Sequence, residues 1–312
     1  MGNRIPLLLF VLSIFCVTGK ANSLPRASVR YGPTENTGTT PHLQEIFLGR
    51  CWGFQQLWDV SPEVDCTDLW EKFFGAFSYR EPCDQTASSY DPFFQAATLE
   101  TPMNRTLFWS GTNALAHLYS DEGRRYSTLE DTLPGHVLNG LRWCGSARAP
   151  GYNGTVCPQC QNRPFWPEAS KFFAQRARGD VFLVLNGTRR DASGNPEDAF
   201  KATSIFARSE LPSLNKAAVS TIHVWVMHDL GVNQPYSESC GKGSLRQLDQ
   251  ILSHDGFRMI CQDDPPFLRH QQCVDAPNSP VCVWSSATSK APKQTIYNNV
   301  LFLILLSIVL YL

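Results

Sequence analysis

The segment Val181–Leu185 constrains the fold of this 312-residue chain more than any other feature of the sequence. It is an unbroken apolar run rich in β-forming residues, too short for a helix, and it stops at the turn sequence Asn-Gly-Thr of residues 186–188. This pattern predicts a buried strand that ends in a turn. Such strands are typical of parallel sheets, in which ligands bind beyond the carboxyl ends of the strands. We therefore take Trp166, before the strand, and Glu210, after it, as candidate site residues.

The N-terminus carries a secretion signal. Arg4 precedes an apolar segment, Ile5–Val17, and the small residues Gly19 and Ala21 follow it. This order predicts a signal peptide over residues 1–22, whose apolar part is too short to span a bilayer. We therefore expect the protein to enter the secretory pathway.

The C-terminus predicts a glycosylphosphatidylinositol (GPI) anchor. Small residues, Ser285–Ser289, are followed by a polar spacer, Lys290–Asn299, and by an apolar tail, Val300–Leu312. Small residues, spacer and tail in this order form the attachment signal for a GPI lipid, so we expect attachment near Ser289 and removal of residues 286–312. A C-terminal tail anchor is the alternative, but the signal peptide and the short apolar tail disfavour it.

Cysteines and glycosylation motifs indicate an oxidising compartment. The chain has eleven cysteines, and because Cys16 lies in the signal peptide, ten are left for up to five disulfide bonds. Sequons at Asn104, Asn153 and Asn186 predict N-glycosylation at surface positions. The formal net charge of -1 gives no electrostatic reason to expect nucleic-acid binding. These features together predict an extracellular location.

Apolar periodicity predicts a mainly helical N-terminal third and further helices beyond it. We expect Thr40 to cap the first of these helices, with Pro41 at its first position, and Thr128 to cap the helix that leads toward Trp143. The apolar faces of the expected helices centre on residues 43–47, 69–77, 91–94, 133–141 and 169–173.

The C-terminal third predicts a strand–helix–strand unit. Apolar runs at Thr221–Met227 and Phe257–Cys261 indicate strands, and between them Ser244 is expected to cap a helix that Gly256 stops. Strands joined by a helix at this spacing lie parallel in one sheet, with a right-handed crossover. Arg105–Ser110 indicates a further short strand.

Three motifs have the residue types of catalytic or metal sites without the context that such sites need. Cys157 and Cys160 have redox or zinc spacing, but no second pair matches them, so we expect each to form a disulfide with a different partner. His223 and His228 fall on opposite faces of their strand and are not expected to share a metal. Residues 241–243 lack the third glycine of a dinucleotide fingerprint. We expect no metal site.

Several residues have both a structural and a functional interpretation. Glu130 and Asp131 lie in the first turn of an expected helix, where acidic side chains oppose the macrodipole and complete a capping box. Trp109 and Trp166 would by default pack in the core. Glu210 lies in a segment without a helical pattern and by itself would be a surface carboxylate.

Seven short segments follow one another along the chain: Phe108–Ser110, Thr128–Thr132, Trp143–Gly145, Phe165–Ser170, Leu185–Gly187, Glu210 and Trp225–His228. In this order they resemble the ADP-ribosyl cyclase/cyclic ADP-ribose hydrolase family of ectoenzymes, and the resemblance covers residues 42–284. Within the family, the branch called bone marrow stromal antigen is most similar at His42–Cys51, Glu238–Gly241, Gln272–Asp275 and the C-terminal tail.

The resemblance implies an α/β fold, α+β overall, of two lobes with the active site in the cleft between them. A mainly helical lobe would comprise residues 31–102 and 128–180, and residues 103–127 and 181–285 would form a lobe with a small parallel sheet flanked by helices. The resemblance also implies a homodimer. The disulfide bonds that it implies are Cys51–Cys66, Cys83–Cys160, Cys144–Cys157, Cys240–Cys261 and Cys273–Cys282.

The resemblance further implies cleavage of the nicotinamide–ribose bond of NAD, which yields ADP-ribose or cyclic ADP-ribose. NAD would be the substrate, no cofactor would be needed, and Glu210 would be the catalytic carboxylate. The residues implied to bind the substrate are Trp109, Ser110, Glu130, Asp131, Trp166, Ser170, Ile205 and Phe206. Because nicotinamide leaves as a neutral ring, one buried carboxylate beside the oxocarbenium ion suffices, and indole faces can bind a flat cation.

The chain departs from the family pattern at three positions. Ile205 stands in place of a threonine or an aromatic residue, Asn139 in place of an acidic residue, and Gly111 in place of a basic one. The ratio of cyclic to linear product is therefore left open.

Two other functions are compatible with parts of the sequence. A surface receptor or adhesion ectodomain would need the fold but not the site, and the retention of Glu210, Glu130 and both candidate tryptophans disfavours it. An ADP-ribosyltransferase is suggested by Arg208-Ser-Glu, but the Leu-Pro that follows breaks the pattern.

Overall fold

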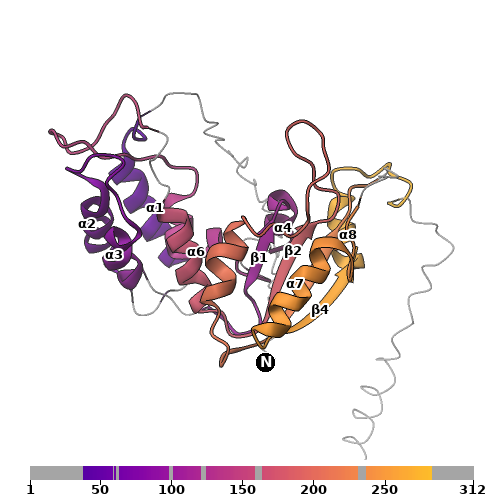
Figure 1. Ribbon diagram of the computed structural model, residues 1–312. Helices are drawn as coiled ribbons and strands as arrows, with labels where there is room; N and C mark the ends of the chain where they lie inside the picture. Colours follow the sequence, from indigo (N-terminus) through magenta and orange to yellow (C-terminus); the bar gives the residue numbers. More distant parts are fainter. Residues whose placement is uncertain are drawn as a thin grey trace, which may run out of the picture. The chain divides into compact units, whose positions relative to one another are not determined.

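The structure is a computed structural model that describes residues 38–58, 60, 63–97, 101–120, 124–158, 164–230 and 237–282 (Figure 1). The expected signal peptide and the expected lipid-attachment segment lie outside these ranges. Within them, no helix combines the length and the apolar character needed to cross a membrane. All described residues belong to one compact unit, Glu35–Leu312, and the two-lobe boundaries stay a prediction.

The described residues include a four-stranded parallel sheet. Its strands are β1 (Leu107–Ser110), β2 (Gly179–Asn186), β3 (Val219–Met227) and β4 (Arg258–Asp263), in the order β1-β2-β3-β4. The register pairs Ser110 with Leu185 and Leu185 with Val226, so the carboxyl ends of neighbouring strands lie at one edge. This confirms the α/β class and the expected parallel pairing.

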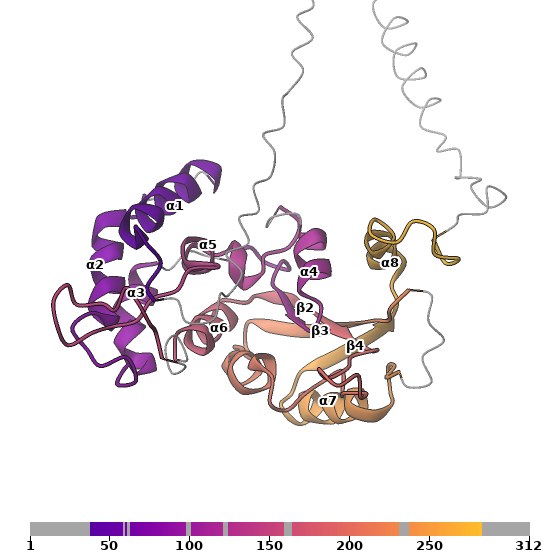
Figure 2. The ribbon, with the colours of Figure 1, turned by 90° about the horizontal axis from the view of Figure 1, so that it is seen from above.

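The two central strands, β2 and β3, are buried on both faces, and their alternate residues pack on opposite faces, whereas β4 at the edge is largely exposed. Val181 and Leu183 pack toward helix α7 (Gly243–His254), whereas Val184 packs toward α4 (Asn113–Ser120) and α8 (Pro266–Gln272). Figure 2 shows α7 on one side of the sheet and α4 and α8 on the other. Coverage of both faces explains why the β2 sequence is apolar throughout rather than alternating.

A separate core lies among helices and is largely aromatic. The helices are α1 (Leu43–Trp58), α2 (Cys66–Phe77), α3 (Asp91–Ala96), α5 (Leu133–Leu138) and α6 (Phe165–Gln175). Phe73 contacts both Phe47 and Trp143, with ring centroids 5.4 and 5.1 Å apart. Trp143 is fully buried, and its indole nitrogen donates a hydrogen bond to the Tyr90 hydroxyl at 2.9 Å. Such rings contribute both apolar area and favourable edge-to-face contacts.

Two predicted helix caps are wrong, and contacts outside the helices explain both of them. α1 begins at Leu43, while the Thr40 hydroxyl accepts a hydrogen bond from the Arg142 backbone. α7 has Lys242 at its N-cap, and the Ser244 hydroxyl instead bonds the Glu238 carboxylate. Both polar side chains therefore stabilise tertiary contacts rather than the helix ends to which we assigned them.

Thr128 does cap a helix and forms the predicted capping box, but the helix that it caps is shorter than expected. Thr128 closes a 3₁₀ turn, η2 (Leu129–Asp131), through a capping box with Asp131. Thr132 then caps α5, and its hydroxyl accepts from the Gly135 backbone N–H at 3.3 Å. Glu130 therefore lies in a 3₁₀ turn rather than in the first turn of an α-helix.

Four of the implied disulfide bonds are confirmed. They are Cys51–Cys66, Cys144–Cys157, Cys240–Cys261 and Cys273–Cys282. Cys83 is also disulfide-bonded, but its implied partner, Cys160, lies outside the described residues. Because Cys157 pairs with Cys144, it does not form a redox or zinc motif with Cys160.

Candidate active site

The predicted site residues come from four elements that contact one another. They are Trp109 and Ser110 from β1, Glu130 and Asp131 from η2, Trp166 and Ser170 from α6, and Glu210 from a π-helical turn, η3 (Phe206–Glu210). α6 contacts both η2 and η3, and β1 contacts η3. Elements far apart in the chain are thus brought together around α6.

Glu210 is buried rather than a surface carboxylate, which corrects the interpretation from sequence alone. It is the last residue of η3, a rare helix type that often occurs at functional sites. Phe206 at the start of the turn and Leu211 after it are both buried in the core. Because Phe206 and Leu211 pack in the core on either side of it, Glu210 is also buried and is only 7% exposed.

The environment of Glu210 favours its neutral form. Burial raises the pKa of its carboxyl to about 8, the hydrogen bond from Ser170 acts against this rise, and the nearby charge of Glu130 adds to it. A buried carboxylate without a compensating positive charge is costly. The site is therefore suited to receive a cation beside Glu210.

The two acidic residues of η2 have different surroundings. Asp131 Oδ2 accepts hydrogen bonds from the backbone N–H and the hydroxyl of Thr128, each at 2.8 Å. In contrast, Glu130 Oε2 is buried without a hydrogen-bond partner among the described residues. Asp131 thus serves the capping box, and the substrate-binding role expected for it stays a prediction, whereas Glu130 has an oxygen left to bind a ligand.

The candidate tryptophans are only partly buried, unlike Trp143. The Trp109 ring contacts the imidazole of His117 edge-on, with centroids 5.9 Å apart. The Trp166 ring meets Phe165 at 5.0 Å and 88°. Each indole therefore packs against the protein on one side and keeps exposed surface that a flat ligand ring can contact.

An arginine that we did not predict lies beside Ser110. The Arg189 guanidinium donates to Ser110 Oγ at 3.1 Å and to Glu197 Oε2 at 2.9 Å. A β-carbon added at Gly111 would lie 3.3 Å from Arg189 Nη1. The side chain of Arg189 thus lies beside Gly111, the position at which the chain lacks the expected basic residue.

Two further predicted residues have opposite exposure. The Ile205 side chain is 46% exposed, at the entry to η3. The Phe206 side chain is 2% exposed and packs against Phe108, with ring centroids 5.6 Å apart. Phe206 therefore has a core position, and of these two residues Ile205 is the one whose side chain is exposed to solvent.

The sequon asparagines lie at turns and strand ends. Asn104 is exposed, and Asn153 and Asn186 are partly exposed. Glycosylation at these positions stays a prediction, and their exposure is compatible with it.

The carboxyl edge of the sheet also borders a hollow of about 210 Å³, lined by residues that follow β1, by the last residues of β2 and β3, by Asp229 and by Gln272 of α8. Ligand binding at these strand ends stays a prediction. Among the described residues, no group of acidic, histidine and cysteine side chains is arranged to bind a metal.

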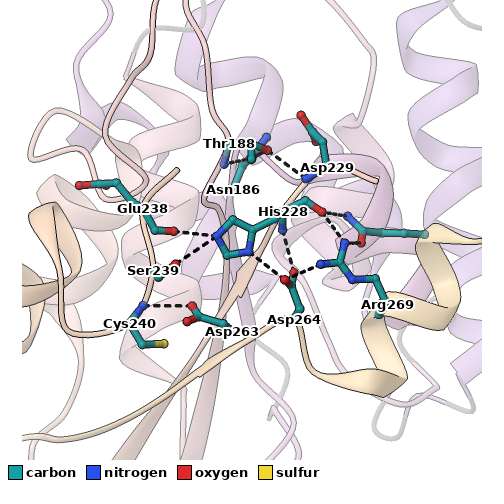
Figure 3. Close-up of polar contacts among 11 residues, drawn as sticks. Asn186, Thr188, His228, Asp229, Glu238, Ser239, Cys240, Asp263, Asp264 and Arg269 are labelled. Atoms are coloured by element: carbon teal, nitrogen blue, oxygen red, sulfur yellow. Dashed lines mark hydrogen bonds and ion pairs between the residues drawn. The ribbon is translucent and has the colours of Figure 1, made fainter. Parts of the chain in front are cut away.

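Close to this edge, Ser239, His228 and Asp264 stand in the order of a catalytic triad (Figure 3). Ser239 Oγ is 3.5 Å from His228 Nε2, and Asp264 Oδ2 is 3.0 Å from Nδ1. However, Nε2 also lies 2.9 Å from the backbone oxygen of Glu238, an atom that can only accept. Nε2 must therefore carry a proton, so it cannot act as a base toward Ser239. The group is structural.

His117 and Arg189 are the site neighbours that sequence reasoning missed. His117 lies on α4 and reaches Trp109 and Glu130 only through packing. Arg189 directly follows the turn at the carboxyl end of β2. The rule that ligands bind beyond such strand ends was a usable signal for Arg189.

Comparison with known proteins identifies the family of the chain. The family model described as ADP-ribosyl cyclase matches residues 40–282. The chain belongs to the ADP-ribosyl cyclase family. It is 40% identical over 264 residues to the ADP-ribosyl cyclase/cyclic ADP-ribose hydrolase of Aplysia kurodai, covering 81% of this chain and 90% of that protein. It is 34% identical over 266 residues to the human ADP-ribosyl cyclase/cyclic ADP-ribose hydrolase 2, covering 82% and 80%.

A solved structure of the family shows the same fold with ligands bound. The Aplysia cyclase complexed with substrate NGD and product cGDPR superposes with a TM-score of 0.74 at 37% identity. The match covers 80% of this chain and all of the Aplysia cyclase chain. The structural similarity thus extends over both the helical core and the sheet of the present chain.

Proposed function

We propose that this protein is a cell-surface NAD glycohydrolase with ADP-ribosyl cyclase activity. The observation that carries the proposal is the buried, hydrogen-bonded carboxylate of Glu210, on a turn packed against the elements that bear Trp109 and Trp166. Family membership supports the same reaction, since the relatives are named as cyclases and cyclic ADP-ribose hydrolases.

The reaction breaks the bond between the ribose and the cationic nicotinamide ring of NAD. Nicotinamide leaves as a neutral molecule, so the leaving group needs no general acid, unlike an ordinary sugar. Positive charge then develops on the ribose, and the Glu210 carboxylate stabilises it in a site with little water. The cationic ring of bound NAD favours the ionised form of Glu210, and Ser170 stabilises that form with its hydrogen bond.

The remaining residues bind and orient the substrate. The exposed surfaces of Trp109 and Trp166 can contact the flat nicotinamide ring, which is cationic before cleavage. Glu130 has a buried oxygen available to the nicotinamide end of the substrate. We assign the exposed side chain of Ile205 to contact with the incoming adenine or water, and its exposure supports this role. These contacts would set whether cyclic or linear product forms.

A receptor with little catalysis is the alternative. Retention of Glu210, Glu130 and both tryptophans favours the enzyme, since a binding protein has no need of a costly buried carboxylate. The test is to incubate the purified protein with NAD and with its guanine analogue, and to separate cyclic from linear products. Release of nicotinamide with both product types supports the proposal, and absence of turnover favours the receptor.

The proposed location at the cell surface is based on the sequences at the two ends of the chain. The signal peptide at 1–22, the sequons and the GPI signal near Ser289 support secretion and lipid anchoring, as in the bone marrow stromal antigen branch. Confirmed disulfide bonds fit the oxidising route. Release from intact cells by phosphatidylinositol-specific phospholipase C would support the anchor, and retention after this treatment would contradict it. We also propose a homodimer, which analytical ultracentrifugation of the released protein tests.

A further inference from the structure

His117 links two of the proposed substrate-binding residues without being one of them. It lies in the second half of α4, with about one third of its side chain exposed. Its Nε2 atom is 3.8 Å from Glu130 Oε2, and its ring packs edge-on against the Trp109 indole. One imidazole thus contacts both a carboxylate and an aromatic surface of the site.

The Glu130 atom that faces His117 is the one that lacks a partner. Oε2 is buried, and it accepts no hydrogen bond from the described residues. A buried carboxylate oxygen left in this state costs free energy, so a donor within reach is strongly favoured. At 3.8 Å, His117 Nε2 is within ion-pair range, and a side-chain movement of less than about 1 Å would make a hydrogen bond.

The charge of Glu130 also matters to Glu210. The negative charge of Glu130 helps to raise the pKa of the Glu210 carboxyl. A hydrogen bond from a donor on α4 to Glu130 would hold the Glu130 carboxylate toward α4. It would thereby weaken the repulsion between the Glu130 and Glu210 carboxylates. His117 is therefore placed to affect the site through Glu130.

We propose that His117 is a positioning residue, whose Nε2–H binds Glu130 Oε2 and fixes the carboxylate that meets the nicotinamide end of the substrate. The inference rests on the proposed function and deepens it. With Glu130 fixed, released nicotinamide stays longer beside the ribosyl cation and excludes water, which favours attack by the adenine of the same molecule. Without the donor, Glu130 is free to turn, and water reaches the intermediate more easily.

Two substitutions separate the hydrogen bond from ring packing. His117→Phe retains an aromatic ring against Trp109 but removes the N–H. His117→Gln removes the ring but retains an N–H donor that can reach Glu130. We expect His117→Phe to lower the ratio of cyclic to linear product by about threefold or more, the scale of a lost contact between coupled groups, and His117→Gln to stay near the wild-type ratio. The matched control is His254→Phe, on the exposed last turn of α7.

A double-mutant cycle with Glu130→Leu, which removes the acceptor, supplies the decisive readout. If His117 acts through Glu130, the two substitutions shift the product ratio in the same direction, and the double variant differs little from Glu130→Leu alone. Additive shifts, or an unchanged ratio in His117→Phe, would overturn the inference. A changed product ratio in His117→Gln, with no change in His117→Phe, would also overturn the inference, since the packing of the ring and not the N–H donor would then control the ratio.

Failure of the inference is distinguishable from failure of the proposed function. Wild-type protein that releases no nicotinamide from NAD contradicts both the enzyme and, with it, this role of His117. If the wild-type protein turns over NAD but the effects of the His117 and Glu130 substitutions are additive, the proposed function stands and only the role of His117 is contradicted. Thermal unfolding of each variant, compared with the His254→Phe control, shows whether a changed ratio comes with a damaged fold.

Discussion

Nδ1 of His228 lies 3.0 Å from Oδ2 of Asp264, while the backbone N–H of His228 donates to the other carboxylate oxygen at 2.9 Å. On the far side of the ring, Nε2 faces the backbone oxygen of Glu238. Both partners only accept hydrogen bonds, so both ring nitrogens must donate, and His228 is an imidazolium ion. Arg269, which pairs with Asp264 and donates to the His228 carbonyl oxygen, completes the cluster (Figure 3).

This cluster predicts a pH-dependent contribution to stability. The hydrogen bond to Asp264 raises the pKa of His228, burial acts against this rise, and the charges of Asp264 and Asp263 add to it. A raised pKa in the folded state stabilises the fold fully below about pH 6.5, the value for an unfolded histidine, and this contribution is lost as pH rises through the folded pKa. We expect His228→Gln to lower the free energy of unfolding by about 1–3 kcal/mol at pH 6 and by less at pH 9. Urea unfolding at both pH values measures the difference, and a pH-independent loss would contradict a charged His228.

A second prediction concerns Arg189 and the charge of the substrate. NAD carries a diphosphate, and the Arg189 guanidinium at Ser110 is a suitable partner for it. We expect Arg189→Gln to raise KM for NAD by about tenfold, the size of one charge-assisted hydrogen bond, with a smaller change in kcat. Steady-state kinetics with NAD and with nicotinamide riboside, which has no phosphate, should show the effect for NAD only.

Arg190→Gln is the matched control for this prediction. Arg190 is the next residue, but its side chain is exposed and bonds the backbone oxygen of Gly194. We expect nearly unchanged KM in this variant. Equal losses for both substrates in Arg189→Gln would point to a disturbed Glu197 contact instead of a lost phosphate partner.

The parts of the fold that could be predicted are those fixed by local pattern. The apolar run Val181–Leu185 is the centre of β2, and Thr221–Met227 is nearly the whole of β3, because strands buried on both faces require continuous apolar sequence. The caps at Thr40 and Ser244 failed for the opposite reason. A hydroxyl that suits an N-cap also suits any backbone or carboxylate partner, and the partner of Thr40 is about one hundred residues away.

The site was predictable in its residues but not in its geometry. Glu210 was singled out by its position after the buried strand and by the family resemblance, yet its burial depends on Phe206 and Leu211 entering a core built from distant elements. His117 carries no local signal, since it meets Glu130 only after α4 and η2 have packed. Charge environments of this kind arise from tertiary structure and cannot be read from spacing.

The raised pKa of Glu210 leads to a prediction about stability in the absence of substrate. Its folded pKa of about 8 exceeds its ordinary value of 4.5, so between these pH values the folded chain binds more protons than the unfolded chain. Stability therefore falls as pH rises through this window. Glu210→Gln removes the cost, and we expect it to stabilise the protein by a few kcal/mol at pH 8 but hardly at pH 4. Thermal unfolding across this range tests the difference, and a variant destabilised at pH 8 would argue against a strained carboxylate.

The same pKa predicts the pH dependence of activity. Catalysis needs the ionised carboxylate, and kcat/KM reports the free enzyme, so kcat/KM for NAD should rise with pH toward a plateau above about 8. The cationic nicotinamide ring favours ionisation once NAD is bound, so kcat should reach its plateau at lower pH. Rate profiles from pH 5 to pH 9 measure both, and coincident profiles would show that bound NAD leaves the carboxyl unaffected.

The most direct measurement of the central claim is the turnover of NAD by purified Glu210→Gln protein, with its folding checked by unfolding curves. The substitution keeps the shape of the side chain but removes the charge that stabilises the ribosyl cation. Because this interaction is stronger in the transition state than with bound NAD, kcat should fall by about two to three powers of ten while NAD affinity changes little. Well-folded Glu210→Gln protein that cleaves NAD at a near-normal rate would contradict the assignment of Glu210 as the catalytic carboxylate.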